Sequence, residues 1–245
     1  MMLRRLIMLG GFAVFAGVAP AAAQFWMPVR APERTAPQSL ARPPEPATIR
    51  REKSGTAFFV DDAGHMLTAR HAVEDCARLV IAKEGRVVLA RTVALSPRFD
   101  LALIKAPKTM GLAAVFPRNG AASVNDMMFA AAYDKLPGMV TGGGVLANAT
   151  VAPGGGEAGH LVIDSTVTFG ASGAPVIDSR GLVEGVISRR TRIDRVLAVG
   201  AGEAKAFLTG NGIRFDQDDR PQIAGGGSRA NRAASISARV TCLQN

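Results

Sequence analysis

Three residues of this sequence could together carry out acyl transfer by a serine, and they occur in the order His71, Asp100 and Ser172. A serine hydroxyl becomes a strong nucleophile when a histidine accepts its proton and a buried carboxylate orients that imidazole. Backbone N–H groups must also face the negative charge that develops on the attacked oxygen. The three residues are therefore candidates for a catalytic triad, provided that the fold brings them together.

Ser172 lies between glycines, in the sequence G-A-S-G over 170–173. Glycine permits the tight bend that would aim the N–H groups of Gly170 and Ser172 at one point, as an oxyanion hole requires. A serine between glycines is a weak signal alone and usually marks a turn. It is stronger here because two apolar strands are predicted directly after it, over 175–177 and 182–188.

His71 follows two predicted strands, over 56–60 and 66–68, and begins a short turn. This local context fits a general base. A lone histidine is more often a core or surface residue, and we assign that role to His65 and His160, which lie in a hairpin turn and a Gly-flanked loop.

Asp100 opens the strongly apolar strand predicted over 101–105. A carboxylate that is partly buried in this way must be paired, and an imidazole is a good partner. A strand-end aspartate without a catalytic role explains this segment about equally well, so the segment is informative only together with the other two.

The order of the three residues separates the classes of serine hydrolase. All three histidines precede Ser172, which excludes the Ser, Asp, His order of α/β-hydrolases, and residues 170–174 do not form their G-x-S-x-G motif. A subtilisin order would need an aspartate before His71, where only Asp61 or Asp62 could serve. The His, Asp, Ser order is that of the chymotrypsin class.

The elements that must position these residues are mostly short strands joined by turns rich in glycine and proline, which predicts an all-β sandwich or a pair of barrels. Helical segments are predicted over 72–76 and 203–208. Residues 214–234 are predicted to be a polar connection, and the alternating residues 236–243 to be a closing strand. Further strands are predicted over 79–82, 87–95, 127–133, 140–151, 161–164 and 196–199.

Four of these segments carry a resemblance to a known family. Residues of about 53–210 resemble the trypsin-like peptidase domain of bacterial HtrA/DegP-type and related periplasmic proteases. The motifs are specific together rather than singly. They are S-G-T-A-F-F-V at 54–60, L-T-A-R-H-A-V at 67–73, D-L-A-L-I-K at 100–105 and G-A-S-G-A-P-V at 170–176.

This resemblance implies a fold of two six-stranded antiparallel β-barrels with the active site between them. The first barrel, about 53–120, would supply the histidine and the aspartate, and the second, about 121–212, would supply Ser172. A C-terminal extension, 213–245, would contain the closing strand. After Leu208 the sequence holds 37 residues, too few for the PDZ domains of larger HtrA proteins, so we expect a protease domain without a PDZ domain.

The resemblance also implies where a substrate binds. Ser188 would open the strand that pairs with the substrate backbone, and Thr166, six residues before Ser172, would lie at the floor of the primary specificity pocket. Because a buried cation needs a carboxylate partner, Thr166 disfavours Lys and Arg and favours a small or aliphatic residue before the scissile bond. We expect Arg190 to narrow the pocket mouth and acidic residues to be accepted near Arg189 and Arg190. That both arginines point to solvent is an equally weighted alternative.

The sequence contains two cysteines, Cys76 and Cys242. An exported protein can form a disulfide, and an even count fits one bridge between them. A zinc site needs more ligands at closer spacing, and the sequence has three histidines and no H-E-x-x-H motif. We therefore expect no metal site and no cofactor.

Residues 1–23 have the pattern of a cleaved secretory signal peptide, with Arg4 and Arg5, an apolar run over 6–18 and an A-x-A site at 21–23. The apolar run is shorter than the roughly 20 residues that a spanning helix needs, so we expect no stable membrane anchor and a periplasmic or secreted protein. Residues 24–52 contain six of the fourteen prolines and are predicted to be a disordered, extended leader.

The formal net charge is +9. No run of basic residues is interleaved with aromatic ones, so nucleic acid is not an expected partner. Contact with an anionic cell-envelope surface is one interpretation of the charge, and simple solubility is the other. The sequence predicts a serine endopeptidase that acts on polypeptides. The alternatives are a serine esterase and a catalytically silent binding or scaffold protein, although a silent protein has no reason to keep all three residues.

Overall fold

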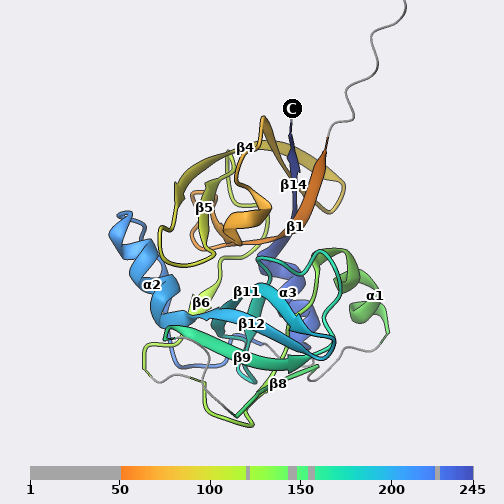
Figure 1. Cartoon of the computed structure of the whole chain (residues 1–245), viewed down its shortest axis with the longest axis vertical. Coiled ribbons are helices and arrows are strands. Elements are labelled where there is room, and N and C mark those ends of the chain that lie inside the picture. Colours follow the sequence, from red (N-terminus) through yellow and green to blue (C-terminus); the bar gives the residue numbers. More distant parts are fainter. Residues whose placement is uncertain (1–50, 120–121, 143–147, 154–157, 224–226, 245) are drawn as a thin grey trace, which may run out of the picture. The chain divides into compact units, whose positions relative to one another are not determined.

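The computed structural model describes residues 51–119, 122–142, 148–153, 158–223 and 227–244, all within the unit Ala47–Asn245 (Figure 1). The predicted signal peptide at 1–23 lies outside these residues, as does the predicted leader at 24–52 except for its last two positions. No helix in the described ranges is long and apolar enough to span a membrane.

The first sheet is a closed barrel of six strands in which every neighbouring pair is antiparallel. Side chains alternate between its two faces, so that Phe59, Met66, Ile104 and Val240 pack together in one apolar core. Around the barrel the strands are β1 (Glu52–Phe59), β14 (Ser237–Leu243), β3 (Arg78–Lys83), β4 (Arg86–Leu95), β5 (Ala102–Lys105) and β2 (His65–Thr68).

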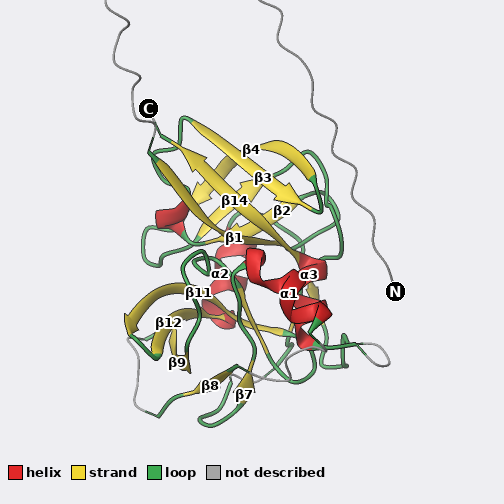
Figure 2. Cartoon of the chain, turned by 90° about the vertical axis from the view of Figure 1, so that its right-hand side faces the viewer, coloured by secondary structure: helices red, strands yellow, loops and turns green. Residues whose placement is uncertain are grey.

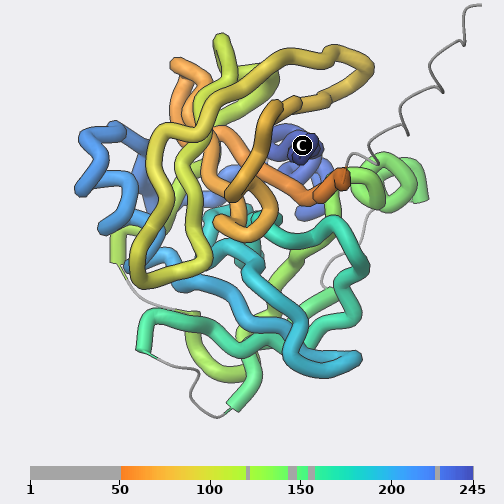
Figure 3. The backbone as a smooth tube through the Cα atoms, turned by 45° about the horizontal axis from the view of Figure 1, so that its top comes forward, coloured from red at the N-terminus to blue at the C-terminus, as the bar shows by residue number. Residues whose placement is uncertain are grey.

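The last strand, β14, is part of the first barrel and lies between β1 and β3. Figure 3 shows this dark blue strand beside the orange first strand. A disulfide joins Cys76 to Cys242 with their Cα atoms 5.3 Å apart, as the sequence predicts. The barrel predicted over 53–120 therefore takes its sixth strand from the segment predicted to be a C-terminal extension.

The second sheet also has six strands, and a bridge between Phe129 and Ile177 connects its two ends. The N–H of each of these residues donates to the carbonyl of the other at 2.9 Å. The two sheets confirm the predicted all-β class of two six-stranded barrels. The order of the second sheet is β10 (Pro175–Ile177), β11 (Val183–Arg192), β12 (Arg195–Gly200), β9 (His160–Ser165), β8 (Ala149–Val151) and β7 (Met127–Met128).

A separate apolar core contains residues from both barrels and from the helices. Phe58 contributes from β1, Val186 from β11, and Leu208 and Ile236 from helices. This shared core fixes the two barrels against each other. His71 and Asp100 of the first barrel can therefore meet Ser172 of the second.

Two helices form where the sequence predicts other structures. The predicted strand over 140–151 is wrong at its start, because helix α1 (Leu136–Thr141) occupies it and only Ala149–Val151 is a strand. Pro137 in the first turn explains this, because its ring fixes φ near the helical value. The predicted polar connection contains helix α3 (Arg229–Ile236), which Ser228 caps by accepting from the N–H of Asn231. Figure 2 shows α1 beside α3.

The remaining elements are short. The predicted helix over 203–208 is α2 (Ala201–Gly210). The helical segment predicted over 72–76 is wrong: the 3₁₀ turn η1 (Arg70–Ala72) ends at Ala72, and a non-helical turn follows over 73–75. Of the strand predicted over 127–133, only β7 (Met127–Met128) forms, and a second 3₁₀ turn, η2 (Tyr133–Lys135), begins at the last predicted residue. Strands β6 (Val115–Phe116) and β13 (Asp216–Gln217) form a parallel pair.

Candidate active site

His71 and Asp100 lie next to the ends of two paired strands of the first barrel, and two hydrogen bonds join them. Asp100 Oδ2 lies 2.7 Å from Nδ1 of the His71 ring, and Asp100 Oδ1 accepts from the backbone N–H of His71 at 3.0 Å. His71 is in turn η1, one residue after β2, and Asp100 lies two residues before the start of β5, which pairs with β2. Both oxygens of one carboxylate thus fix the position and the ring orientation of His71.

Ser188 on β11 also binds Asp100, from the second barrel. Its buried hydroxyl donates to Asp100 Oδ2 at 2.6 Å. Partial burial of Asp100 opposes its charged form, but the hydrogen bonds from His71 and Ser188 outweigh burial and lower the pKa of Asp100 to about 2. Asp100 is therefore ionised at neutral pH. The sequence pointed to Ser188 only as a substrate-pairing residue, and this contact between barrels was not predictable from local sequence.

Ser172 completes a continuous line of hydrogen bonds. His71 Nε2 lies 2.9 Å from the Ser172 hydroxyl oxygen. The hydrogen bond with Asp100 raises the pKa of His71 above 6.5, against the opposing effect of partial burial. This arrangement can move a proton from Ser172 to His71 and stabilise the resulting imidazolium.

The loop of Ser172 follows a path that needs its glycines. Gly170 has φ +86° and Gly173 has φ +83°, both in the left-handed region. A Cβ atom on Gly173 would lie 2.2 Å from the carbonyl oxygen of Thr56, so no larger residue fits there. The N–H of Gly173 donates to the carbonyl of Ile187 at 2.7 Å. The loop is therefore held between β1 of the first barrel and β11 of the second.

The N–H groups of Gly170 and Ser172 have no hydrogen-bond partner within the described part of the chain. They are the two donors that the sequence assigned to an oxyanion hole. Both remain available to a bound group, whereas the next two N–H groups, of Gly173 and Ala174, donate to carbonyls of the protein.

A cavity of about 440 Å³ lies beside Ser172. Three buried aliphatic side chains, Val167, Ile187 and Val196, contribute to its wall. Among the described residues no carboxylate lines it, so these residues offer no partner for a cationic side chain in the cavity. Ser188, Arg189 and Arg190 line it as well.

Thr166 does not line this cavity, in contrast to the position predicted for it. Ser165 and Val167 are buried, while Thr166 is exposed. The cause is the alternation of side chains at the end of β9, which turns every second residue away from the barrel. Val167, one residue later, is the aliphatic group at the cavity wall. Continuing the alternation of β9 through this position would have identified it in the sequence.

Arg190 lies at the mouth of the same cavity. Its guanidinium donates to the carbonyl of Val167 and lies over the ring of Phe169, 5.8 Å from the ring centre. Phe169 also lines the cavity and is 97% exposed. Arg189 and Arg190 are both exposed and both line the cavity. That Arg190 narrows the pocket mouth stays a prediction. Phe169 was not predicted to line the pocket.

The other two histidines lie elsewhere. His65 is paired with Asp61 through Nδ1 at 2.5 Å, which also leaves Asp61 unsuited to a subtilisin-like role. His160 packs against the ring of Phe99 at 5.4 Å. Within the described ranges, no three His, Cys, Asp or Glu side chains gather in a way that could hold a metal ion.

Comparison with known families and proteins gives a consistent result. Residues 55–186 match the family of the trypsin-like peptidase domain. A protein of Brucella suis named probable periplasmic serine endoprotease DegP-like is 31% identical over 150 residues, which cover 60% of this chain and 29% of that protein. The protein y4bJ of Sinorhizobium fredii is 29% identical over 219 residues, which cover 83% of this chain and 34% of that protein.

Two solved structures show that the chain shares its fold with known proteases. The serine endoprotease from Yersinia pestis has a TM-score of 0.54 at 20% identity, covering 64% of this chain and 57% of that one. The HtrA-type protease AlgW, solved with a decapeptide, has a TM-score of 0.54 at 19% identity, covering 64% of this chain and 51% of that one. The chain spans about a third of the length of the two curated relatives.

Proposed function

Because this chain belongs to the trypsin-like peptidase domain family, we propose that it is an exported serine endopeptidase with His71, Asp100 and Ser172 as its catalytic triad. The observation that carries this proposal is the line of hydrogen bonds from Ser172 to His71 at 2.9 Å and from His71 to Asp100 at 2.7 Å. HtrA- and DegP-like proteases among the relatives and fold neighbours support the same reaction class.

In the proposed reaction, the Ser172 oxygen attacks the carbonyl carbon of the substrate while Nε2 of His71 accepts the hydroxyl proton. The resulting imidazolium is stabilised by Asp100, which stays ionised. His71 then gives the proton to the leaving amine, the peptide C–N bond breaks, and an acyl ester forms on Ser172. A water molecule, activated by His71 in the same way, releases the acid and restores the hydroxyl.

The N–H groups of Gly170 and Ser172 would donate to the oxyanion of both tetrahedral intermediates. Their availability supports this role. The positive φ of Gly170 turns the chain just before the nucleophile, and it is the reason that glycine is required at this position.

The proposed substrate is an extended polypeptide that pairs with β11 from Ser188 to Arg190. Its residue before the scissile bond would enter the cavity with the aliphatic wall of Val167, Ile187 and Val196. A small or aliphatic side chain fits this wall, and Lys or Arg would be desolvated there without a carboxylate partner. Export is part of the proposal, and the Cys76–Cys242 disulfide supports it because disulfides persist in oxidising compartments.

Labelling with a fluorophosphonate probe, which reacts covalently with activated serines, tests this proposal. The mature protein should be labelled and should hydrolyse denatured casein, and Ser172→Ala should lose both by several orders of magnitude. Ser179→Ala is the matched control, because Ser179 is an exposed serine outside this cavity.

Two other outcomes would replace the proposed function. Hydrolysis of small esters without cleavage of casein would identify a serine esterase. Absence of both activities in a folded protein that binds denatured casein would identify a silent binding protein. Undiminished casein turnover by Ser172→Ala would remove Ser172 from the mechanism.

A further inference from the structure

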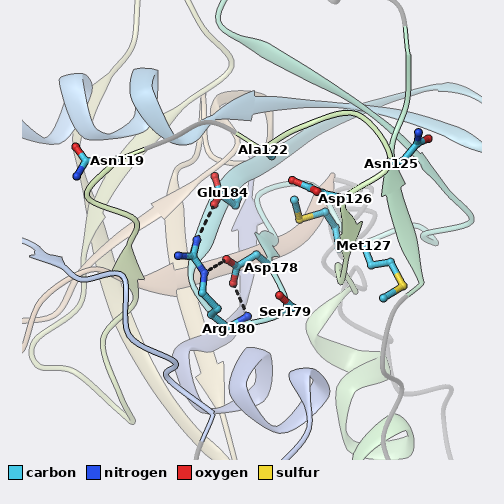
Figure 4. A pocket seen from close by; sticks show the side chains of 10 residues that line it. Asn119, Ala122, Asn125, Asp126, Met127, Asp178, Ser179, Arg180 and Glu184 are labelled. Atoms are coloured by element: carbon cyan, nitrogen blue, oxygen red, sulfur yellow. Dashed lines mark hydrogen bonds and ion pairs between the residues drawn. The ribbon is translucent and has the colours of Figure 1, made fainter.

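A second cavity, of about 450 Å³, lies at the turn between β10 and β11 (Figure 4). It shares no lining residue with the cavity beside Ser172. Its polar lining includes Asp126, Asp178, Arg180 and Glu184. The lining thus contains three carboxylates and one guanidinium, so it carries a net negative charge. Asp178 and Glu184 lie beside Arg180, whereas Asp126 is exposed and its Oδ2 accepts from the N–H of Ser123 at 2.7 Å.

Glu184 is the unusual group in this cavity. It is 5% exposed and lies on β11 within the second barrel. One of its oxygens, Oε1, is 3.7 Å from Nη2 of Arg180, and the other, Oε2, is buried and has no hydrogen-bond partner among the residues that the structure describes. A buried carboxylate oxygen without a donor is costly, so it normally marks a place where a donor binds.

Arg180 cannot supply that donor, because Asp178 already holds it. Its Nε donates to Asp178 Oδ2 at 2.7 Å, and its backbone N–H donates to Asp178 Oδ1 at 2.8 Å. Figure 4 shows Asp178 and Glu184 pointing toward Arg180 from two sides. Its Nη1 donates to the backbone carbonyl of Asp219 at 3.4 Å and lies 3.9 Å from Oδ1 of the same residue. The guanidinium approaches Glu184 only through Nη2, which lies 3.7 Å from Oε1.

The other polar groups around Glu184 do not supply a hydrogen-bond donor to its Oε2 either. Lys205 lines a neighbouring cavity with Glu184, but its ammonium donates to the carbonyl of Pro117 at 2.8 Å. Glu203 and His160 line that neighbouring cavity too, and the buried Nδ1 of His160 has no partner. Burial, followed by the charge of Asp178, raises the pKa of Glu184 to about 7 against the opposing charges of Arg180 and Lys205.

We propose that this cavity binds an organic cation, an ammonium or guanidinium group of about the size of a lysine or arginine side chain, with Glu184 Oε2 as its acceptor and Asp126 as a second anionic wall. A cation of this kind supplies the N–H donor that Oε2 lacks. A metal ion fits less well, because the residues described here offer no cluster of three metal ligands. The site is separate from the proposed triad and does not depend on it.

Isothermal titration of the full-length mature protein with agmatine, which carries a guanidinium and an ammonium group, tests the site. We expect saturable binding with one site at about pH 8. Glu184→Gln should weaken it at least about tenfold, because the charged acceptor is lost while the shape is kept. Asp126→Asn should weaken it by a smaller factor, and the neutral analogue butylurea should not bind. Binding should also weaken at about pH 6, where a proton competes for Glu184.

Two control variants distinguish binding at Glu184 from a general attraction of cations and from binding at the triad. Asp62→Asn removes an exposed charge in the first barrel and should leave the affinity unchanged. Ser172→Ala should also bind agmatine normally, so failure of the proposed protease activity would not affect this test. Equal affinity in Glu184→Gln and the wild type would overturn the assignment. So would displacement of agmatine by micromolar calcium or zinc, because the site would then be a metal site.

Discussion

Thr56 of the first barrel binds Gly170 of the second: its buried hydroxyl donates to the Gly170 carbonyl oxygen at 2.8 Å. The backbone N–H of the same threonine donates to the carbonyl of Ser172 at 2.9 Å. The peptide groups on either side of the nucleophile are therefore oriented by a strand that belongs to the other barrel. The direction of the proposed oxyanion donors depends on this contact.

Replacing Thr56 by valine keeps the shape of the side chain and removes the hydroxyl. It also leaves the N–H of Tyr133, which donates to that hydroxyl at 2.9 Å, without a partner. We expect kcat/KM to fall roughly ten- to a hundredfold through misplacement of the Ser172 loop, with the fold retained. Thr150→Val on β8, where the side chain is exposed, should leave kcat/KM unchanged. Equal rates in both variants would mean that the loop keeps its geometry without Thr56.

The dependence of activity on pH should report the pair of His71 and Asp100. His71 must be neutral to accept the proton of Ser172, and its pKa is raised above 6.5. The rate therefore rises with pH through an acidic limb whose midpoint lies above 6.5. Asp100→Asn removes the main cause of the raised pKa, so the limb should move to lower pH while the maximal rate falls by about four orders of magnitude.

A series of kcat/KM measurements across pH for the two proteins checks this prediction. Ser188→Ala is an informative intermediate, because it removes one donor to Asp100 and leaves His71 in place. If the midpoint of the acidic limb of kcat/KM against pH is the same in Asp100→Asn as in the wild type, another group sets the pKa of His71.

Arg190 should restrict which side chain precedes the scissile bond. Arg190→Ala removes the guanidinium that lies over Phe169 and is bound to Val167. We expect larger aliphatic residues such as Leu or Met to gain about tenfold in relative kcat/KM, and any preference for acidic residues nearby to decrease. Cleavage of a peptide library measures both effects. Arg192→Ala, which removes another exposed arginine of β11, should keep the original profile, and a shared change would assign the effect to net charge.

The sequence was informative about the triad and less so about its surroundings. The motifs that contain His71, Asp100 and Ser172 are weak singly but specific together, so the approach of the three residues could be expected. Thr166 was misplaced because a spacing taken from relatives does not reveal where the alternation of a strand ends.

The burial of Glu184 was also hidden. A glutamate on a strand ordinarily points to solvent, and only the tertiary structure shows that β11 is covered on both faces there. Helix α3 was missed because alanines and arginines between a polar loop and a strand give a weak periodic signal, and its packing against α1 and β14 is tertiary.

Stability should depend on pH through Glu184. Its pKa in the folded state is about 7, above the ordinary 4.5, so the folded protein binds this proton more tightly than the unfolded chain does. The free energy of unfolding should therefore decrease as the pH rises from about 5 to 8, by at most about 3 kcal/mol from this group. Glu184→Gln should lose this dependence and be the more stable protein at the alkaline end. Urea unfolding at several pH values measures the free energy of unfolding of both proteins. The same dependence on pH in the wild type and in Glu184→Gln would contradict a raised pKa of Glu184 in the folded state.

The position of β14 has a consequence for the time at which activity can arise. Thr241 pairs with Val80, and Val240 pairs with Gly55, so the first barrel lacks a wall until the ribosome has added β14. Early segments of a nascent chain fold before late ones exist, yet the half that holds His71 and Asp100 is open at that stage. Such long-range pairing is slow to form. The proposed peptidase would therefore gain its base only after β14 has paired, and a chain still in synthesis would not cleave its neighbours.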